Sequence, residues 1–305
     1  MIEKSPVAYV PLGSLEWHGE HAPLGLDGLK AHALCEAAAE RTGGVVFPTV
    51  YWGAFDTVPF PFTFHFKRKG IRNLARAILK QLAGWNFKAI VLLTGHYPPA
   101  QIRLLRKECR RFNKRARAAR PPAERPLGRS ALRRCRLPVT TVFTNMLLRT
   151  IEQAPSDALA IGIAEPALAT DIEYYGDHAG MWETSLMMAI RPELVDLSAM
   201  PANLPTLERL AKFCVMGQDP ISKATAEKGG RAIEHIAQRL AAVLERALDE
   251  HSDRAFEEVY KAYDKSVSIF SPGIVQVART ALDVHSLGEL LRYELWTLRN
   301  LWRGT

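Results

Sequence analysis

The chain has 305 residues, a net charge of +8 at neutral pH, and ordinary contents of hydrophobic (48%) and charged (24%) residues. This length suits one large domain, or a domain with an appendage, that buries about three quarters of its unfolded surface. No apolar run approaches the ~20 residues of a membrane span, and the N-terminus lacks the apolar core of a signal peptide, so we expect a cytoplasmic protein without membrane association.

The first two hundred residues alternate short apolar runs with amphipathic stretches, which is typical of a parallel sheet covered by helices on both faces. This alternation predicts strands near residues 7–12, 45–48, 88–94 and 137–143, and helices near 28–41, 70–84 and from 99 onward. The Pro- and Phe-rich stretch 58–66 is too aromatic for a plain linker, and it can serve as a lid, as a wall of a substrate pocket, or as both. Residues 155–176 have no clear period, so we expect a loop there.

The last part of the chain has a helical pattern. A long packing helix begins near residue 222, and a separate tail follows from residue 251. The final helix of this tail carries an apolar stripe at three- to four-residue spacing: Leu287, Leu291, Leu295, Leu298 and Trp302. We expect this stripe to dock on the body or on a neighbouring subunit. The chain therefore divides into a main domain, residues 1–250, and a helical C-terminal extension, residues 251–305.

One segment makes the protein basic. Residues 103–136 contain fourteen Lys or Arg and two Glu, so the remainder of the chain is net negative. The early part of this segment has a helical apolar stripe, whereas the later part has prolines and no period, which indicates an exposed basic insertion at about 113–136. Arg-rich runs can bind nucleic acid, but this insertion has no aromatic residue for base stacking. We therefore favour a solvated loop over a polyanion contact.

The most informative residues follow the first predicted strand. Glu16 and His18 are two positions apart, so their side chains point the same way in extended chain. Asp27 comes nine residues after His18, beyond a Pro-Leu-Gly turn that can fold back. Two carboxylates and an imidazole on one loop suit a divalent transition metal, and an aspartate can bridge two ions, one on each oxygen. The same residue types are also common on solvated loops.

Two further clusters occupy comparable positions. His96 lies just past the strand near 88–94, where parallel sheets place their functional residues. His178 and Glu183 lie in a polar, Gly-punctuated stretch, and Glu183 falls on or just before the first turn of a helix. Three clusters that each follow a strand or a glycine turn favour a single metal centre.

Taken together, these residues resemble the creatininase (creatinine amidohydrolase) family. The matching pieces of this chain are G-S-L-E-W-H-G followed by Asp27, T-G-H at 94–96, D-H-A-G-M-W-E-T-S at 177–185, and the weaker G-Q-D-P at 217–220 with A-T-A-E-K-G at 224–229. The resemblance spans roughly residues 5–240. It implies a three-layer αβα fold, a hydrolase of cyclic or linear amides (non-peptide C–N bonds), two divalent metal ions (zinc, manganese or iron), and a homo-oligomer, commonly a hexamer.

The resemblance also assigns roles to residues. By it, five residues are metal ligands, with Asp27 bridging: Glu16, His18, Asp27, His96 and Glu183. His178 is then the proton-transfer residue, and Tyr97 and Trp182 are candidates for substrate binding. Pro98 departs from the pattern, because creatininase itself has a glutamate at this position that binds the second metal. A proline has no ligating side chain, so we expect a weaker second metal site and poor activity on creatinine.

The favoured function is hydrolysis of a small-molecule amide by metal-activated water, which forms near neutral pH. His178 gives a proton to the departing nitrogen, a task that suits an imidazole. No nucleic-acid or membrane partner is expected on this hypothesis. The alternative is an inactive relative that binds RNA or another polyanion, or acts as a scaffold, through its Arg-rich insertion and helical tail. All six proposed site residues are present, which argues against a decayed site.

Overall fold

A parallel sheet forms the centre of the molecule. The computed structural model describes residues 6–54, 60–119, 158–170, 172, 176–268 and 273–301. In this part of the chain the strands are β1 (Val7–Gly13), β2 (Val45–Val46), β3 (Val50–Tyr51), β4 (Ala89–Thr94) and β5 (Leu159–Ala164). The sheet has the order β2-β1-β4-β5, and β3 pairs with the carboxyl-terminal end of β1, past the residues that pair with β2. Strands β1, β4 and β5 are buried along their whole length, as is typical of parallel strands covered on both faces.

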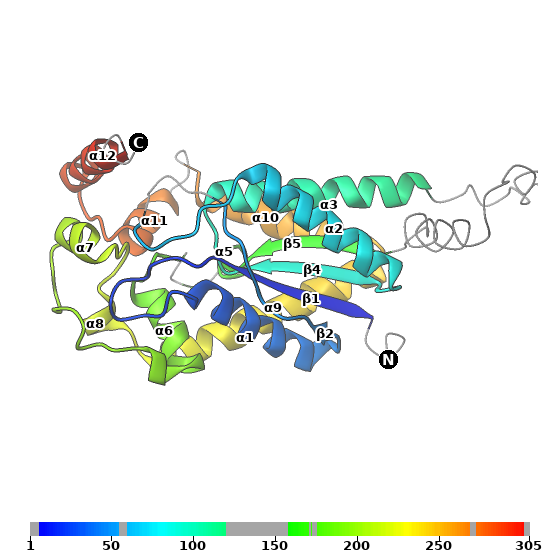
Figure 1. Cartoon of the computed structure of the whole chain (residues 1–305), viewed down its shortest axis with the longest axis horizontal. Helices are drawn as coiled ribbons and strands as arrows, with labels where there is room; N and C mark the ends of the chain where they lie inside the picture. The colour runs from blue at the N-terminus through cyan, green and yellow to red at the C-terminus, as the bar shows by residue number, and fades with distance from the viewer. Residues whose placement is uncertain are drawn as a thin grey trace, which may run out of the picture.

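Helices cover both faces of the sheet (Figure 1). One face carries α1 (Leu26–Thr42), α6 (Met181–Ile190) and α9 (Ala226–Asp249), and the other carries α2 (Arg68–Gly84) and α3 (Pro99–Ala119). Two clusters of buried apolar side chains fill the spaces between the sheet and these helical layers. The structure thus confirms the predicted α/β fold with helices on both faces of a parallel sheet. None of the described helices combines the length and apolar character needed to cross a membrane.

Shorter elements and the extension complete the molecule. The short elements are α5 (Glu165–Leu168), η1 (Pro192–Leu194), α7 (Thr206–Phe213) and α8 (Pro220–Lys223). The extension forms α10 (Arg254–Ser266), α11 (Gly273–Ala281) and α12 (Leu287–Leu301). Figure 1 shows α10 running along α3, whereas α11 and α12 lie beside α7 at the end of the molecule far from the N-terminus.

Two side chains close the outer edge of β5. The amide group of Asn113, on α3, donates to the Ala160 carbonyl oxygen at 2.9 Å and accepts from the Ala160 N–H at 2.8 Å. The Tyr260 hydroxyl, on α10, donates to the Gly162 carbonyl oxygen at 2.9 Å and accepts from the Ala164 N–H at 3.1 Å. Backbone groups that would otherwise be open to another strand are thereby satisfied. The first helix of the extension is therefore packed into the edge of the sheet.

One sequence prediction is wrong in this region. The expected loop at 155–176 contains β5 and α5, because the six-residue run from Leu159 to Ala164 is apolar throughout and fits a buried parallel strand without alternation. The helix expected from residue 99 onward is confirmed by α3, which continues to Ala119, so residues 113–119 of the basic segment belong to it. Arg117 on that helix pairs with Asp253 at 3.4 Å. The predicted strand at 137–143 and the remainder of the insertion lie outside the described residues.

The apolar stripe of α12 does not dock on the body of this chain. Its four described leucines are 54–72% exposed: Leu287, Leu291, Leu295 and Leu298. The helix packs instead through another face, where Tyr293 is buried in a cluster with Phe60 and Leu210. The expectation of docking on the body is therefore wrong for this stripe, because aromatic side chains on the neighbouring face make the contact. Docking on another subunit stays a prediction.

Candidate metal centre

The loop after β1 folds back on itself and brings its three candidate residues together. Glu16 and His18 lie on the outgoing part of this loop, and the Glu16 N–H donates to the Leu24 carbonyl oxygen at 3.0 Å. Helix α1 begins two residues later, so Asp27 falls in its first turn. The Pro-Leu-Gly turn predicted from the sequence therefore returns Asp27 to the carboxyl end of β1, where Glu16 and His18 lie.

The other two candidate residues reach the same place from β4 and α6. His96 follows β4 after a single glycine, and a side chain on Gly95 would collide with the carbonyl oxygen of Asp27. Glycine is thus required for the close approach of these two segments. Glu183 lies in the first turn of α6, as predicted. The carboxyl ends of adjacent parallel strands open at one edge of the sheet, which is where such folds place their sites.

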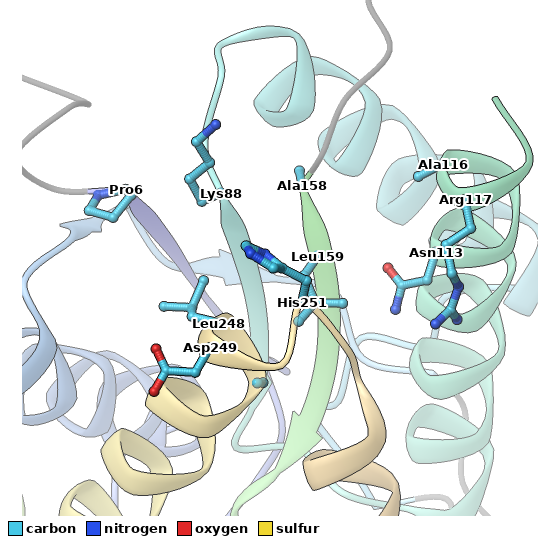
Figure 2. Close-up of a pocket in the computed structure, with 11 residues that line it drawn as sticks. Pro6, Lys88, Asn113, Ala116, Arg117, Ala158, Leu159, Leu248, Asp249 and His251 are labelled. Carbon is cyan, nitrogen blue, oxygen red and sulfur yellow. The ribbon is translucent and has the colours of Figure 1, made fainter. Parts of the chain in front are cut away.

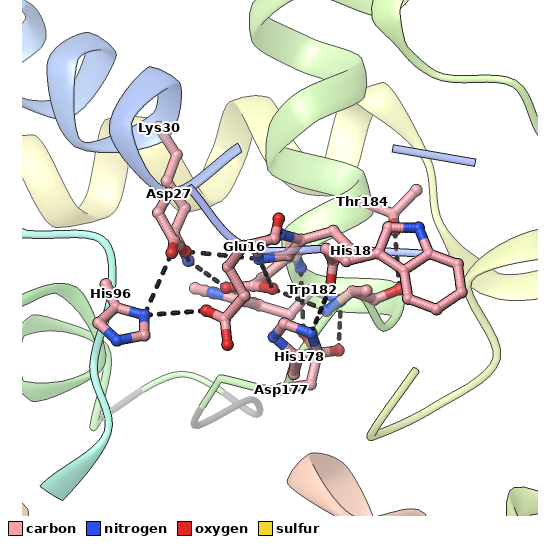
Figure 3. Close-up of polar contacts among 12 residues, drawn as sticks. Glu16, His18, Asp27, Lys30, His96, Asp177, His178, Trp182 and Thr184 are labelled. Atoms are coloured by element: carbon pink, nitrogen blue, oxygen red, sulfur yellow. Dashed lines mark hydrogen bonds and ion pairs between the residues drawn. The ribbon is translucent and has the colours of Figure 1, made fainter. Parts of the chain in front are cut away.

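The donor atoms form three groups (Figure 3): two share Asp27, and the third consists of Glu16, His18 and His178. In the first group, His96 Nδ1 lies 2.9 Å from Glu16 Oε2 and 3.2 Å from Asp27 Oδ2. In the second group, His18 Nε2 lies 3.5 Å from Asp27 Oδ1 and 3.4 Å from Glu183 Oε2. Within each group the donor atoms all lie within 4.8 Å of one another. Asp27 offers one carboxylate oxygen to each of the first two groups, so it can bridge two ions.

Backbone carbonyl groups orient both imidazoles. His18 Nδ1 lies 2.8 Å from the Glu16 carbonyl oxygen, and His96 Nε2 lies 3.1 Å from the Ala54 carbonyl oxygen. A carbonyl oxygen can only accept, so each of these nitrogens carries a hydrogen. In the neutral ring the opposite nitrogen then points a lone pair at the carboxylates. Metal-binding histidines are commonly oriented in this way.

The electrostatics of the centre fit a cation between these groups. Glu16, Asp27 and Glu183 are at most 5% exposed. His18 Nε2 and Asp27 Oδ2 have no hydrogen-bond partner among the described residues. Burial alone would lower the pKa of His18, but the carboxylates of Asp27 and Glu183 raise it well above its usual value, and Glu16 and Asp27 do the same to the pKa of His96. Carboxylate oxygens and imidazole nitrogens are a donor set that suits a divalent transition metal.

A buried lysine and a further glutamate, which the sequence analysis missed, flank Glu183. Lys30 is fully buried, and its Nζ contacts Glu183 Oε1 and lies 3.2 Å from Glu165 Oε2. The Tyr97 hydroxyl lies 2.7 Å from the same Glu183 oxygen. Two donors thus hold Oε1, and Oε2 faces the second donor group. One signal for this arrangement was available in the sequence: Lys30 lies on the apolar face of the helix predicted near 28–41.

Asp177 and Trp182 support the start of α6. The Asp177 carboxylate accepts from the N–H of Trp182 at 2.9 Å and of Glu183 at 3.2 Å. Burial, and then the charge of Glu183, raise the pKa of Asp177 to about 8. Trp182 is 5% exposed, belongs to the core cluster, and donates from Nε1 to Glu165 at 2.6 Å. Its described contacts therefore hold the site together, whereas it was predicted to contact substrate.

His178 lies beside the second donor group. Its Nε2 donates to the Trp17 carbonyl oxygen at 2.9 Å, so the free lone pair is on Nδ1. Its ring stacks on Phe60, with centroids 4.2 Å apart and planes 3° apart, and lies 4.4 Å from the His18 ring. Backbone bonds with Met216 fix the residue in place. Burial, and then the neighbouring His18, lower the pKa of His178.

A cavity of about 320 Å³ opens onto these groups. Its polar side consists of Glu16, Asp27, His96, His178 and Glu183. Tyr97 also lines it, in keeping with its predicted contact with substrate, whereas Trp182 is absent from the lining. The volume is that of a small-molecule site, since pockets for such ligands begin near 300 Å³.

Comparison with known proteins gives the family. A sequence profile for creatininase (creatinine amidohydrolase) matches residues 1–244. The chain belongs to the creatininase family. A creatinine amidohydrolase from Pseudomonas putida is 28% identical over 251 residues, which span 77% of this chain and 87% of the relative. The chain is thus a creatininase-family amidohydrolase, and its clustered His, Glu and Asp side chains fit a metal-dependent hydrolase.

Solved creatininase structures share the fold. A crystal structure of creatinine amidohydrolase (creatininase) matches with a TM-score of 0.58 at 21% identity, covering 79% of this chain and 90% of that chain. A mutant creatininase of the Zn–Zn type matches with a TM-score of 0.56 at 20% identity, covering 81% and 92%. These likenesses confirm the three-layer arrangement predicted from the resemblance.

The creatininase-family fold also explains the two prolines after His96. Pro99 is the first residue of α3, a position where a proline costs no hydrogen bond. The Pro98 carbonyl oxygen accepts from Gln101 N–H at 2.9 Å and from Ile102 N–H at 3.2 Å, which are the first bonds of that helix. Pro98 therefore helps to start α3 and contributes no donor side chain to the centre.

A second cavity opens at the opposite end of the sheet (Figure 2). It measures about 680 Å³ and is lined by residues that precede the strands, such as Pro6, Lys88 and Ala158, and by Asp249 and His251. None of the groups of metal-donor side chains found among the described residues lies there. Among the described residues, the larger cavity of this creatininase-family chain therefore has no arrangement suited to metal chemistry.

Proposed function

We propose that this protein hydrolyses the C–N bond of a cyclic or linear small-molecule amide, with two divalent cations held at the candidate metal centre. The observation that supports it most is the pair of donor groups that share Asp27. Glu16, Asp27 and His96 would hold one ion, and His18, Asp27 and Glu183 the other. Creatininase structures of Zn–Zn and Mn types are known, so zinc and manganese are the first ions to test, and iron the third.

Bound ions of this kind polarise a carbonyl group and bring the pKa of a water molecule to about 7. The chain supplies the proton transfer. Since Nε2 of His178 already donates to Trp17, Nδ1 is the atom that accepts a proton. The water oxygen bonds to the carbonyl carbon, the C–N bond breaks, and Nδ1 of His178 passes the water's proton to the departing nitrogen. The lowered pKa of His178 keeps the resting ring neutral and ready to accept.

Lys30 and Tyr97 have a positioning role in this proposal. Both contact Oε1 of Glu183, so Oε2, which also accepts from the Ala179 N–H at 2.7 Å, is the oxygen that would bind an ion. Pro98 supplies no further carboxylate to that position. The second ion should therefore bind more weakly than the first, and creatinine should be a poor substrate. Assembly as a homo-oligomer and a cytoplasmic location complete the proposal, and both are predictions.

The alternative, a polyanion-binding module, is not favoured by the arrangement of α3. Several of its arginines are neutralised by acidic residues of α10. Arg106 lies 3.0 Å from Asp264, and Arg110 donates from Nε to Glu257 at 2.7 Å. A helix that has several of its arginines already paired offers less charge to a nucleic acid than its sequence indicates.

The proposal is tested by metal analysis together with a substrate screen. The protein is loaded with zinc or manganese, and the bound metal is counted by mass spectrometry. The loaded protein is then assayed against cyclic ureides, lactams, formamides, short peptides and creatinine. We expect about two metals per chain and hydrolysis of at least one amide class, with creatinine among the poorest substrates. Absence of bound metal, or efficient creatinine hydrolysis as the main activity, would contradict the proposal.

A further inference from the structure

The cavity at the metal centre has a second, apolar side to which the extension contributes. Besides the carboxylates and histidines, the cavity is lined by the apolar side chains of Phe60 and Met216, next to His178, and by Val267 and Leu282. Val267 follows α10 and Leu282 follows α11, so both lie beyond residue 244, where the match to the family ends. The part of the chain that carries the family's motifs thus forms the polar side, and the extension completes the apolar side.

The position of Leu282 is fixed by a buried ion pair. The next residue, Asp283, accepts from Nη2 of Arg209 on α7 at 2.8 Å. Arg209 is 1% exposed. The Thr206 hydroxyl donates to the Asp283 carbonyl oxygen at 3.1 Å. Leu282 itself packs with Met216 in the apolar cluster that includes Phe60 and Tyr293.

Val267 is held in place by the end of α10. Its N–H donates to the Tyr263 carbonyl oxygen at 3.0 Å at the end of α10. That helix is attached to the sheet by the bonds of Tyr260 to β5. Both contributions of the extension therefore have defined anchors on the body, so they can act as a rigid wall.

The charges of this wall restrict what can lie against it. No Lys, Arg, Asp or Glu from α10 or α11 is among the described residues that line the cavity. Burying a charged substituent there would leave it without a partner, at a cost of several kcal/mol. Burying an aliphatic or aromatic group is favourable by about 25 cal/mol for each Å² of its surface.

We infer that the C-terminal extension is the specificity wall of this enzyme, and that the substrate is an amide with an uncharged aliphatic or aromatic substituent that packs against Val267 and Leu282. This inference rests on the proposed function, since it assumes that the substrate's carbonyl group lies at the metal centre. It names the substrate class that the centre alone leaves open.

Binding of hydroxamates to the zinc-loaded protein tests the inference without turnover. Acetohydroxamate and hexanohydroxamate share a metal-chelating head and differ by four methylenes. Each methylene buried against the wall should improve affinity by up to about fourfold. We expect the longer probe to bind at least about tenfold more tightly by calorimetry, and the gain to fall below about threefold in Leu282→Asp. Leu291→Asp, on the exposed stripe of α12, is the matched control and should keep the full gain.

Val267→Asp provides a second variant in case Leu282→Asp fails to fold, which its circular dichroism and melting curve would show. The inference would be overturned if the longer hydroxamate kept its advantage in affinity in folded Leu282→Asp or Val267→Asp. It would also be overturned if the longer hydroxamate had no advantage in the unsubstituted protein. If the gain is absent while an amide is still hydrolysed, only the inference fails. If the gain is present but no amide is hydrolysed, only the proposed function fails. If neither probe binds, both fail.

Discussion

The two ends of the sheet differ in what their cavities contain. The cavity at the amino ends of the strands is about 680 Å³, roughly twice the 320 Å³ of the cavity at the carboxyl ends. Yet Lys88 and Asp249 at the amino end are exposed, whereas Asp27 and Glu183 at the carboxyl end are at most 2% exposed. Water weakens charges at the first end, and burial strengthens their interactions at the second. The chemistry therefore follows from burial and from loop placement at the strand ends, not from cavity size.

The largest effect should come from the residue shared by both donor groups. Asp27→Asn should lower bound zinc from about two to less than one per chain and reduce kcat/KM by about 10³ or more, since several kcal/mol of transition-state stabilisation depend on the ions. Asp249→Asn is the matched change at the amino end and should leave both values unaltered. Equal losses in the two variants would remove the distinction between the ends.

Substitution of the proposed proton carrier separates catalysis from metal binding. His178→Ala should lower kcat by roughly 10²–10⁴ while most of the zinc stays bound, because the ring moves a proton and is not required as a ligand. His251→Ala, at the amino end, should change kcat by less than about twofold. Loss of zinc in parallel with activity would instead place His178 among the ligands.

The buried lysine should matter for stability. Lys30→Met leaves two buried carboxylates, Glu165 and Glu183, without their cation, and breaking such a pair costs about 3–5 kcal/mol. Urea unfolding of the metal-free protein measures this. Adding Glu165→Gln should recover part of the loss, because Glu183 stays without its cation. Lys88→Met, on an exposed residue at the other end, should cost no more than about 0.5 kcal/mol. A loss that the second substitution does not relieve would show that Lys30 acts through something other than this pair.

A smaller effect is expected from pH. His21 lies behind the centre, with Nε2 3.0 Å from the Ala179 carbonyl oxygen. Burial lowers its pKa to about 4, against the raising effect of that hydrogen bond. The folded protein thus keeps the ring neutral, while the unfolded chain takes up a proton below pH 6.5. Stability should be full above pH 6.5 and fall by at most about 3 kcal/mol as the pH drops towards 4.

Unfolding free energies of the His21→Gln variant, measured between pH 7 and 4.5, check this expectation. The variant should lose less stability over this range than the unsubstituted protein. His251→Gln, at the amino end, should follow the unsubstituted profile. Identical profiles for all three proteins would exclude a contribution from His21.

The candidate residues chosen from the sequence lie together in the structure because they follow recognisable strands and turns. Glu16 and His96 come directly after β1 and β4, which are unbroken apolar runs, and parallel strands bring such positions to one edge. The fold class followed from the alternation of apolar runs with amphipathic stretches along the first two hundred residues. β5 was missed, because its six residues, with Gly162 among them, show no alternation of apolar and polar side chains and lie among loop-like neighbours.

Residues that act through distant partners could not be predicted. Lys30 is a charge on an apolar helix face, and its partner Glu183 lies 153 residues away in the chain. Asp27, three residues earlier, lies 4.0 Å from the Lys30 Nζ, but the closer partners Glu165 and Glu183 are far away in the sequence. The apolar stripe of α12 gave the opposite difficulty, since its spacing was correct but the helix packs through Tyr293 on another face. In both cases the outcome depends on contacts between residues that are far apart in the sequence.

Anomalous scattering from crystals of the zinc-loaded protein tests the central claim most directly. The account predicts two peaks, one on each side of the Asp27 carboxylate, with ligand distances of about 2.0–2.2 Å. One ion should contact Asp27 Oδ2, Glu16 and His96, and the other, with lower occupancy, should contact Asp27 Oδ1 together with the side chains of His18 and Glu183. Zinc bound only at the amino-end cavity, or ions that do not contact Asp27, would contradict it.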